Sequence, residues 1–203
     1  IDTDLFSHHL ELLLQGNSVE LPSFNFKTGR REWHGHRLQL NEDTVIIVEG
    51  LHGLNPVLLP RSLDKNLIFK MYVSPLLPLN LDDHNRIPTS YLRLLRRIVR
   101  DFETRNSSVQ RTMSMWDSVR RGEKRWIFPY QENADVLFNS AYLVEFAVIR
   151  SHAERILMTV PKNCPEYGEA HRLMKFLSYF NPVSDKDVPA TSLLRSFIGG
   201  SSL

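Results

Sequence analysis

Three short apolar segments limit the folds that this chain can adopt. They cover residues 44–48, 67–73 and 134–140, and the first is a continuous apolar run rather than an alternating one. A continuous run predicts a strand covered on both faces, as in a parallel sheet between helices. Apolar residues recur at helical spacing in the segments before, between and after these strands. These segments cover residues 3–15, 90–105, 109–121, 142–151 and 169–180. This alternation predicts an α/β fold with a parallel sheet, to which residues 152–160 would add a last strand.

A different pattern lies between the first predicted helix and the first predicted buried strand. The helix over 3–15 should stop at Gly16, a residue typical of helix C-termini. The following segment, VELPSFNFKTGRREWHGHRLQL, alternates in short stretches that are broken by Pro22, Gly29 and Gly35. It predicts an extended segment and a β-hairpin that stands out from the main body.

The composition indicates where the protein is located more than what it does. The formal net charge of +2 gives no reason to expect nucleic acid or a membrane as partner. No apolar run approaches the roughly 18–20 residues of a membrane span. The single cysteine, Cys164, excludes an intrachain disulfide and a CxxC metal site, which favours a reducing cytoplasm.

An acid directly follows the first apolar run, in VIIVEGLHGLNP at residues 45–56. Glu49 would lie just past the carboxyl end of a strand, where parallel sheets present their ligands. In a nucleotide site such an acid can hold Mg²⁺, directly or through water, or orient an attacking group. A strand-end acid that faces solvent or caps the next turn would give the same pattern. The residues alone leave both interpretations open.

The predicted helix over 90–105 carries a second candidate site in RLLRRIVRDFETR. Arg93, Arg97 and Arg100 are spaced four and three apart, so they share one helical face. Asp101 follows Arg97 by four residues and can hold its guanidinium in place. Guanidinium groups fork onto phosphate oxygens, so several on one face suit a polyphosphate. The alternative is a solvated basic face that makes surface ion pairs.

Other motifs indicate structure rather than chemistry. LDDHNR at 81–86 predicts a polar loop with a capping residue rather than a metal site, because consecutive residues rarely converge on one ion. The histidine pairs His8–His9 and His34–His36 are typical of surface positions. Trp33 and Trp126, with Phe24 and Phe26, could line a base pocket, although aromatics at such spacing are more typical of a core. The chain contains no GxxxxGK[ST], GxGxxG, GxSxG or HExxH motif.

Taken together, several of these motifs resemble one family. ELPSFNF, IVEGLHGLNP, RRIVRDFETR and ADVLFNSA are similar to segments of the uridine kinase and phosphoribulokinase family of P-loop phosphotransferases. FNFKTGRRE, LNLDDHNRIPT and LLRSFIGGS resemble the bacterial uridine kinase-like nucleoside kinases, which occur in longer chains behind threonyl-tRNA-synthetase-like N-terminal domains. The resemblance covers nearly all of residues 1–200.

The resemblance implies ATP-dependent and Mg²⁺-dependent transfer of a phosphoryl group to a nucleoside hydroxyl, by an enzyme of the cytoplasm. Its partners would be ATP and a small-molecule acceptor, and the sequence leaves a homo-oligomer open. Glu49 would lie near Mg²⁺, and Phe24, Asn25 and Phe26 would lie beside the nucleoside. Four arginines would belong to a lid that closes over the phosphates, with the last three acting in catalysis: Arg93, Arg97, Arg100 and Arg105.

The family pattern also predicts how the chain is organised. Residues 1–182 would form the C-terminal part of a nucleoside-kinase-like domain, with a lid over about 90–125, and residues 183–203 would form a tail. The chain begins without methionine and inside a predicted helix, so we expect a fragment. The phosphate loop and the aspartate that takes the proton from the ribose hydroxyl would precede Ile1, and the fragment alone would be inactive.

Departures from the family pattern leave the acceptor open. Phe24 and Asn25 stand where uridine kinases have Tyr and Asp, and Gly29 stands where they have a base-contacting His. One alternative is a kinase for a sugar phosphate, as in the phosphoribulokinase branch. Another is a non-catalytic regulatory or RNA-associated module on a kinase scaffold, in which basic residues 111–125 would form the binding surface.

Overall fold

The computed structural model of the protein describes residues 1–25, 28–60 and 62–202. These residues form two compact units. The first unit comprises Ile1–Met71 with Lys124–Val136, and the second comprises Tyr72–Glu123 with Leu137–Leu203. None of the helices in the described part of the chain is both long and apolar enough to span a membrane.

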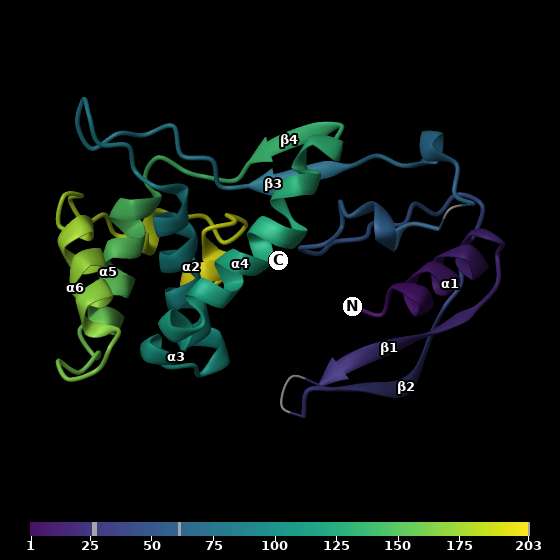
Figure 1. Ribbon diagram of the computed structural model, residues 1–203, viewed down its shortest axis with the longest axis horizontal. Helices are drawn as coiled ribbons and strands as arrows, with labels where there is room; N and C mark the ends of the chain where they lie inside the picture. The colour runs from purple at the N-terminus through teal and green to yellow at the C-terminus, as the bar shows by residue number, and fades with distance from the viewer. Residues whose placement is uncertain (26–27, 61, 203) are drawn as a thin grey trace. The chain divides into compact units, whose positions relative to one another are not determined.

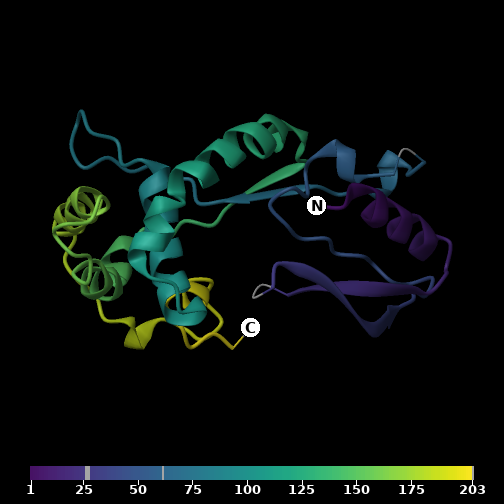
Figure 2. The ribbon, with the colours of Figure 1, turned by 60° about the horizontal axis from the view of Figure 1, so that its bottom comes forward.

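The first unit contains a helix and a β-hairpin, both as predicted. Helix α1 (Thr3–Leu14) contacts strand β1 (Val19–Asn25), which pairs antiparallel with β2 (Arg30–Leu38) (Figures 1 and 2). Asp2 caps α1, because its Oδ1 accepts a hydrogen bond from the backbone N–H of Leu5 at 3.0 Å. The same carboxylate forms an ion pair with Arg31 of β2 at 2.6 Å. First the Leu5 N–H and then Arg31 lower the pKa of Asp2 below its ordinary value.

Helix α1 ends at the predicted position for a local reason. Gly16 has a φ of +78°, a left-handed conformation that a residue with a Cβ adopts only at a cost. This conformation lets Gly16 N–H donate to Leu13 O and Asn17 N–H donate to Leu12 O, each at 2.9 Å. Two of the last carbonyls of the helix are therefore satisfied by the chain that leaves it.

The predicted strand over 44–48 does not form. The segment has no regular structure, and the side chains of Val45 and Ile47 are 84% and 88% exposed. A strand needs a neighbour for its backbone groups, and β-propensity alone does not supply one. In the described residues the parallel pairing is made instead by two later segments.

Strands β3 (Met71–Ser74) and β4 (Val136–Asn139) form the parallel pair of the α/β fold, with helices on its flank. Val136 N–H donates to Lys70 O and Ser140 N–H donates to Ser74 O, so both strands advance in the same direction. These strands overlap two of the three predicted apolar segments, but the prediction that both are buried is wrong, because Met71 and Val73 of β3 are 50% and 55% exposed. Side chains of β4 also remain exposed, because the described residues do not cover both faces of the pair.

The second unit is built mainly of helices that share one core. Helix α2 packs against α5 and α7, and α5 packs against α6 (Figure 1). The predicted apolar stripe of α2 is buried in this core, with Leu92, Leu95 and Val99 at 0% exposure. The helices are α2 (Thr89–Arg105), α3 (Val109–Ser114), α4 (Trp116–Trp126), α5 (Glu145–Leu157), α6 (Tyr167–Leu177) and α7 (Arg195–Ile198). Short 3₁₀ turns cover Pro56–Leu58, Lys65–Leu67, Phe128–Asn133 and Asp185–Asp187.

The prediction of a last strand over 152–160 is wrong, because α5 continues to Leu157. Phe146, Ile149, Ala153 and Ile156 are buried and recur at helical spacing, so one helix places them all in the core. The other helical predictions hold, although the segment over 109–121 is divided into α3 and α4. Ser108 caps α3 by accepting a hydrogen bond from Arg111 N–H at 3.3 Å.

A buried ion pair joins α2 to α5 within the second unit. Arg96 and Glu145, at 7% and 0% side-chain exposure, form a two-pronged contact through Arg96 Nε and Nη2. Arg96 Nη2 also donates to the carbonyl of Ser140 at 2.6 Å, and its guanidinium carbon lies 4.7 Å from the ring centroid of Phe197 in α7. Each buried charge therefore has a hydrogen-bonded partner of opposite sign, which offsets the cost of removing the two charges from water.

We expect Glu145→Gln to lower the free energy of unfolding by about 3 kcal/mol or more, because it leaves Arg96 buried without its counter-charge. The measurement is denaturant unfolding followed by circular dichroism. Glu169→Gln is the matched control, since it removes one partner of an exposed pair with Arg172 and should cost less than about 1 kcal/mol. Equal losses in the two variants would contradict a dominant role for the buried pair.

Candidate functional site

The candidate anion site lies on α2, where the sequence places arginines at helical spacing. The helix extends past Asp101 to Arg105, and Asn106 ends it in the left-handed conformation at a φ of +50°. Burial of the apolar stripe fixes the orientation of α2 about its axis. The arginines that lie outside the stripe are therefore placed at the edge of the buried face. Of the predicted lid residues, the structure brings three together and separates one.

Asp101 gathers the three arginines. Its Oδ1 accepts from Nη2 of Arg100 at 3.1 Å and from Nη1 of Arg105 at 3.2 Å, and its Oδ2 lies 3.2 Å from Nε of Arg97. The carboxylate is 7% exposed, whereas the three arginine side chains are 25% to 58% exposed. Three guanidinium charges against one carboxylate leave an excess of two positive charges at the surface, which suits a multiply charged anion.

Arg93 is placed differently from the other predicted lid residues. It forms a two-pronged ion pair with Glu123 of α4, whose side chain is 6% exposed. That partner lies thirty residues away in the sequence and neutralises the Arg93 charge. Sequence reasoning alone did not predict the contact, because no local spacing indicates it.

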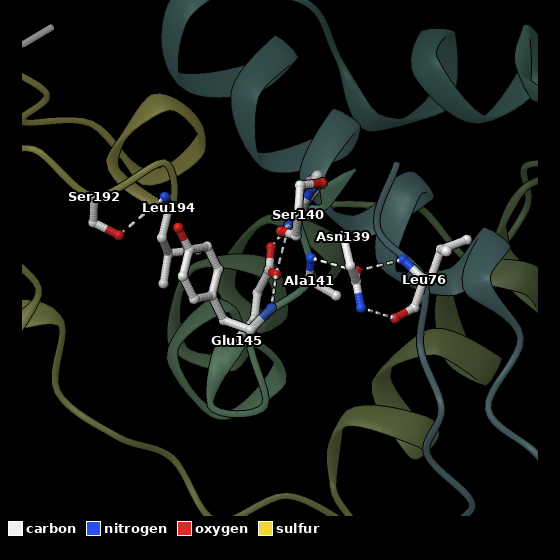
Figure 3. A network of polar contacts seen from close by, with 9 residues as sticks. Leu76, Asn139, Ser140, Ala141, Glu145, Ser192 and Leu194 are labelled. Carbon is white, nitrogen blue, oxygen red and sulfur yellow. Dashed lines mark hydrogen bonds and ion pairs between the residues drawn. The ribbon is translucent and has the colours of Figure 1, made fainter. Parts of the chain in front are cut away.

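A polar network at the carboxyl ends of β3 and β4 was also missed. Asn139 Nδ2 donates to Leu76 O at 2.8 Å, while its Oδ1 accepts from Leu76 N–H at 2.8 Å and from Ala141 N–H at 3.0 Å (Figure 3). The side-chain amide thereby continues the pairing of the strands beyond their last residues. The only signal in the sequence is an asparagine at the end of an apolar strand.

Polar contacts also hold the loop after β4, and Figure 3 shows those around Ser140 and Glu145. Ser140 is buried, its carbonyl accepts from Arg96, and Glu145 accepts from Tyr142 N–H at 3.4 Å. In the segment that leads into α7, Ser192 Oγ accepts from Leu194 N–H at 3.3 Å. The loop at the carboxyl end of the sheet is thus fixed to the arginine helix through buried polar contacts.

Glu49 lies in the first unit, directly after the segment over 44–48 where a strand was predicted, and it is exposed. The chain turns directly after it, with Gly53 N–H donating to Gly50 O at 3.0 Å. Across residues 1–25, 28–60 and 62–202, no group of three His, Cys, Asp or Glu residues could hold a metal ion. One carboxylate is nonetheless compatible with Mg²⁺, which commonly takes one or two protein carboxylates and completes its shell with phosphates and water.

The predicted substrate residues lie at the end of β1. Phe24 is 56% exposed, and Asn25 Nδ2 donates to Glu32 Oε1 of the facing strand at 2.8 Å. Asn25 Oδ1 also accepts from Thr28 N–H at 3.2 Å. Phe26 lies outside the described residues. Asn25 therefore shapes the tip of the hairpin.

The segment 81–86 is a polar loop, as predicted. Asp82 Oδ1 accepts from the N–H groups of His84 and Asn85, both at 2.9 Å, in a local turn. The side-chain amide of Asn85 and then the His84 N–H lower the pKa of Asp82 below its ordinary value. The carboxylate of Asp82 therefore has a structural role in this turn that requires no metal ion.

Comparisons with known proteins agree with the motifs. The sequence pattern of the phosphoribulokinase / uridine kinase family matches residues 1–147. The uridine kinase of Bacillus pumilus is 31% identical over 137 residues, which cover 67% of this chain and 56% of that protein. The uridine kinase of Brevibacillus brevis is 30% identical over 137 residues, covering 67% and 55%, respectively.

A third relative matches a longer stretch. The uridine kinase of Vibrio atlanticus is 27% identical over 160 residues, which cover 77% of this chain and 66% of that protein. The matched stretch thus spans little more than half the length of the Bacillus and Brevibacillus relatives.

The pairing of Arg93 yields a prediction about anion binding. We expect Arg97→Gln to weaken the binding of inorganic tripolyphosphate to the chain by about tenfold, the loss of one charge-assisted contact. Arg93→Gln should weaken it by less than about threefold, because Glu123 already neutralises that charge. Isothermal titration calorimetry at low salt measures both. Equal losses would show that Arg93 serves the anion as much as Arg97 does.

Proposed function

The chain belongs to the phosphoribulokinase / uridine kinase family, and we propose that the protein containing it transfers the γ-phosphoryl group of ATP to a hydroxyl of a nucleoside. The observation that carries this proposal is the convergence of Arg97, Arg100 and Arg105 on one buried acid, in a chain that matches a kinase family. The names of the matched relatives, all uridine kinases, support a nucleoside as the acceptor.

In this proposal the three arginines are the catalytic lid residues. Phosphoryl transfer involves little covalent chemistry for a protein to perform, so catalysis rests on positioning and on stabilising charge. Guanidinium groups held in a fixed arrangement stabilise charge on the transferring phosphoryl group without reorganising during the reaction. Arg93 contributes to the lid by holding α2 to α4 through Glu123.

The proposal assigns the metal and acceptor contacts to the first unit. Glu49 would provide one carboxylate oxygen to Mg²⁺, which would neutralise phosphate charge when bound. Phe24, Asn25 and Phe26 would contact the nucleoside near the tip of the hairpin. These 203 residues contain no GxxxxGK[ST] motif, so activity is to be measured on the full-length protein that contains them. We propose the cytoplasm as its location, because ATP is the donor.

We expect Arg97→Ala and Arg100→Ala each to lower kcat of the full-length kinase by about 10³-fold, the scale on which a phosphate-neutralising arginine contributes. A coupled assay of ADP release measures this effect. Arg172→Ala is the control, because this exposed arginine pairs with Glu169 on α6. Unchanged turnover in both lid variants would remove the lid assignment.

We expect nucleosides, rather than sugar phosphates, to be phosphorylated when the full-length protein is screened with ATP and Mg²⁺. The measurement is acceptor-dependent ADP release across both compound classes, with product identity checked by mass spectrometry. Turnover of sugar phosphates alone would overturn the nucleoside assignment while leaving phosphoryl transfer intact. Turnover of neither class, combined with salt-sensitive RNA binding, would favour a non-catalytic module.

We expect Glu49→Gln to raise the Mg²⁺ concentration that gives half-maximal activity by about tenfold or more, because an amide oxygen is a weaker ligand for a hard cation than a carboxylate. Glu42→Gln, at an exposed acid of the same unit, is the control. A Mg²⁺ titration of initial rates decides the matter. Parallel titration curves for Glu49→Gln and the unmodified protein would exclude Glu49 from the metal site.

A further inference from the structure

Asp101 is surrounded by more positive charge than one carboxylate neutralises. Arg97 and Arg105 lie four residues before and after it, and Arg100 directly precedes it, so all three contacts arise within about two turns of α2. The backbone of Asp101 is fixed as well, because its carbonyl accepts from Asn106 N–H and from Ser107 N–H, the latter at 3.0 Å.

Compensation of a buried charge explains only part of this arrangement. One guanidinium balances the single charge of Asp101, whose side chain is 7% exposed. Each further arginine adds like-charge repulsion at helical spacing, which costs about 0.2–0.5 kcal/mol per pair. Without Asp101, repulsion and side-chain entropy would spread the guanidinium groups into solvent, since an arginine side chain has about 2 kcal/mol of rotamer entropy to lose.

The contacts with Asp101 leave part of each guanidinium available. Arg97 lies closest to Asp101 through Nε, in an ion pair without the alignment of a hydrogen bond, whereas Arg105 donates a hydrogen bond through Nη1. Arg100 uses Nε and Nη2. Among the described residues, no hydrogen bond is formed by Arg97 Nη1 or Nη2, Arg100 Nη1 or Arg105 Nη2, so each arginine retains at least one nitrogen for an anion.

The geometry points to Asp101 as a positioning residue for a linear polyphosphate. It does not touch the phosphates itself; it holds three guanidinium groups at a fixed spacing, so that their remaining nitrogens meet successive phosphate groups together. The identity of the anion as the triphosphate of ATP rests on the proposed function, whereas the positioning role rests on the contacts of α2.

This role and simple electrostatics predict opposite results for one substitution. Asp101→Asn removes a negative charge and raises the excess charge of the cluster from two to three. If the arginines acted only as a cloud of charge, tripolyphosphate would bind more tightly. If Asp101 positions them, tripolyphosphate binds more weakly in spite of the added charge.

The test is calorimetric binding of inorganic tripolyphosphate and of inorganic phosphate to the 203-residue chain. We expect Asp101→Asn to weaken tripolyphosphate binding by about tenfold and phosphate binding by much less, because only the longer anion needs several arginines at once. Asp117→Asn makes the same charge change at an exposed acid of α4 and should leave tripolyphosphate affinity unchanged or slightly raised. Unchanged or tighter tripolyphosphate binding by Asp101→Asn overturns the inference.

Asp101→Glu gives a second test at constant charge, and circular dichroism monitors the folding of every variant. The added methylene displaces the carboxylate, so positioning predicts a loss of tripolyphosphate affinity of about threefold or more and a smaller ratio of tripolyphosphate to phosphate affinity. Affinities for both anions equal to those of the unmodified chain would overturn the inference. This variant decides the matter if Asp101→Asn does not fold.

The full-length protein separates this inference from the proposed function. With an active kinase, we expect Asp101→Asn to lower kcat by at least tenfold with little change in KM for the acceptor. If no acceptor is phosphorylated while both Asp101 variants still lose tripolyphosphate affinity, the proposed function fails and the positioning role stands. If the kinase is active and neither variant changes turnover or tripolyphosphate affinity, the positioning role alone fails.

Discussion

The buried ion pair between Arg96 and Glu145 sets the arrangement of the second unit. Two charges removed from water are tolerated only when each meets the other in good geometry, so the pair requires α2, α5 and the loop after β4 to meet at one place. Successive residues of a helix are about 100° apart, so an inward-facing Arg96 also fixes where its neighbours face. Arg97, the next residue, is therefore turned toward the border of the buried face, and its side chain is 25% exposed.

The acids of this unit determine which arginines of α2 keep a usable charge. Glu145 neutralises Arg96, and Glu123 neutralises Arg93, each through a two-pronged contact with a buried carboxylate. Asp101 is shared among three arginines and therefore neutralises none of them fully. A row of five arginines that appears uniform in the sequence thus divides into two structural ones and a cluster suited to an anion.

Sequence reasoning predicted those features that depend on nearby residues. Helix α1 with its glycine stop, the hairpin, and the buried stripe of α2 follow from local periodicity and turn chemistry, and so does the contact between Arg97 and Asp101. The strand over 44–48 did not form, because strand formation depends on a partner elsewhere in the chain. The pairing of Arg93 with Glu123 spans thirty residues, and no spacing rule indicates it. The end of α5 was misplaced because HAERILMTV fits both strand and helix as an isolated stretch.

The same division between local and distant contacts applies to the candidate site. All residues of the arginine cluster and their shared acid, Asp101, belong to the last three turns of α2. The cluster therefore requires only that α2 is folded and that Arg96 holds it in place. A metal and acceptor site built on Glu49 and the hairpin depends on tertiary contacts, because these residues belong to a different unit. In the proposed function, affinity for phosphate groups would therefore come from α2 itself. The proposed function assigns selection of the acceptor to the first unit, whose hairpin tip departs from the uridine kinase pattern at Phe24 and Asn25.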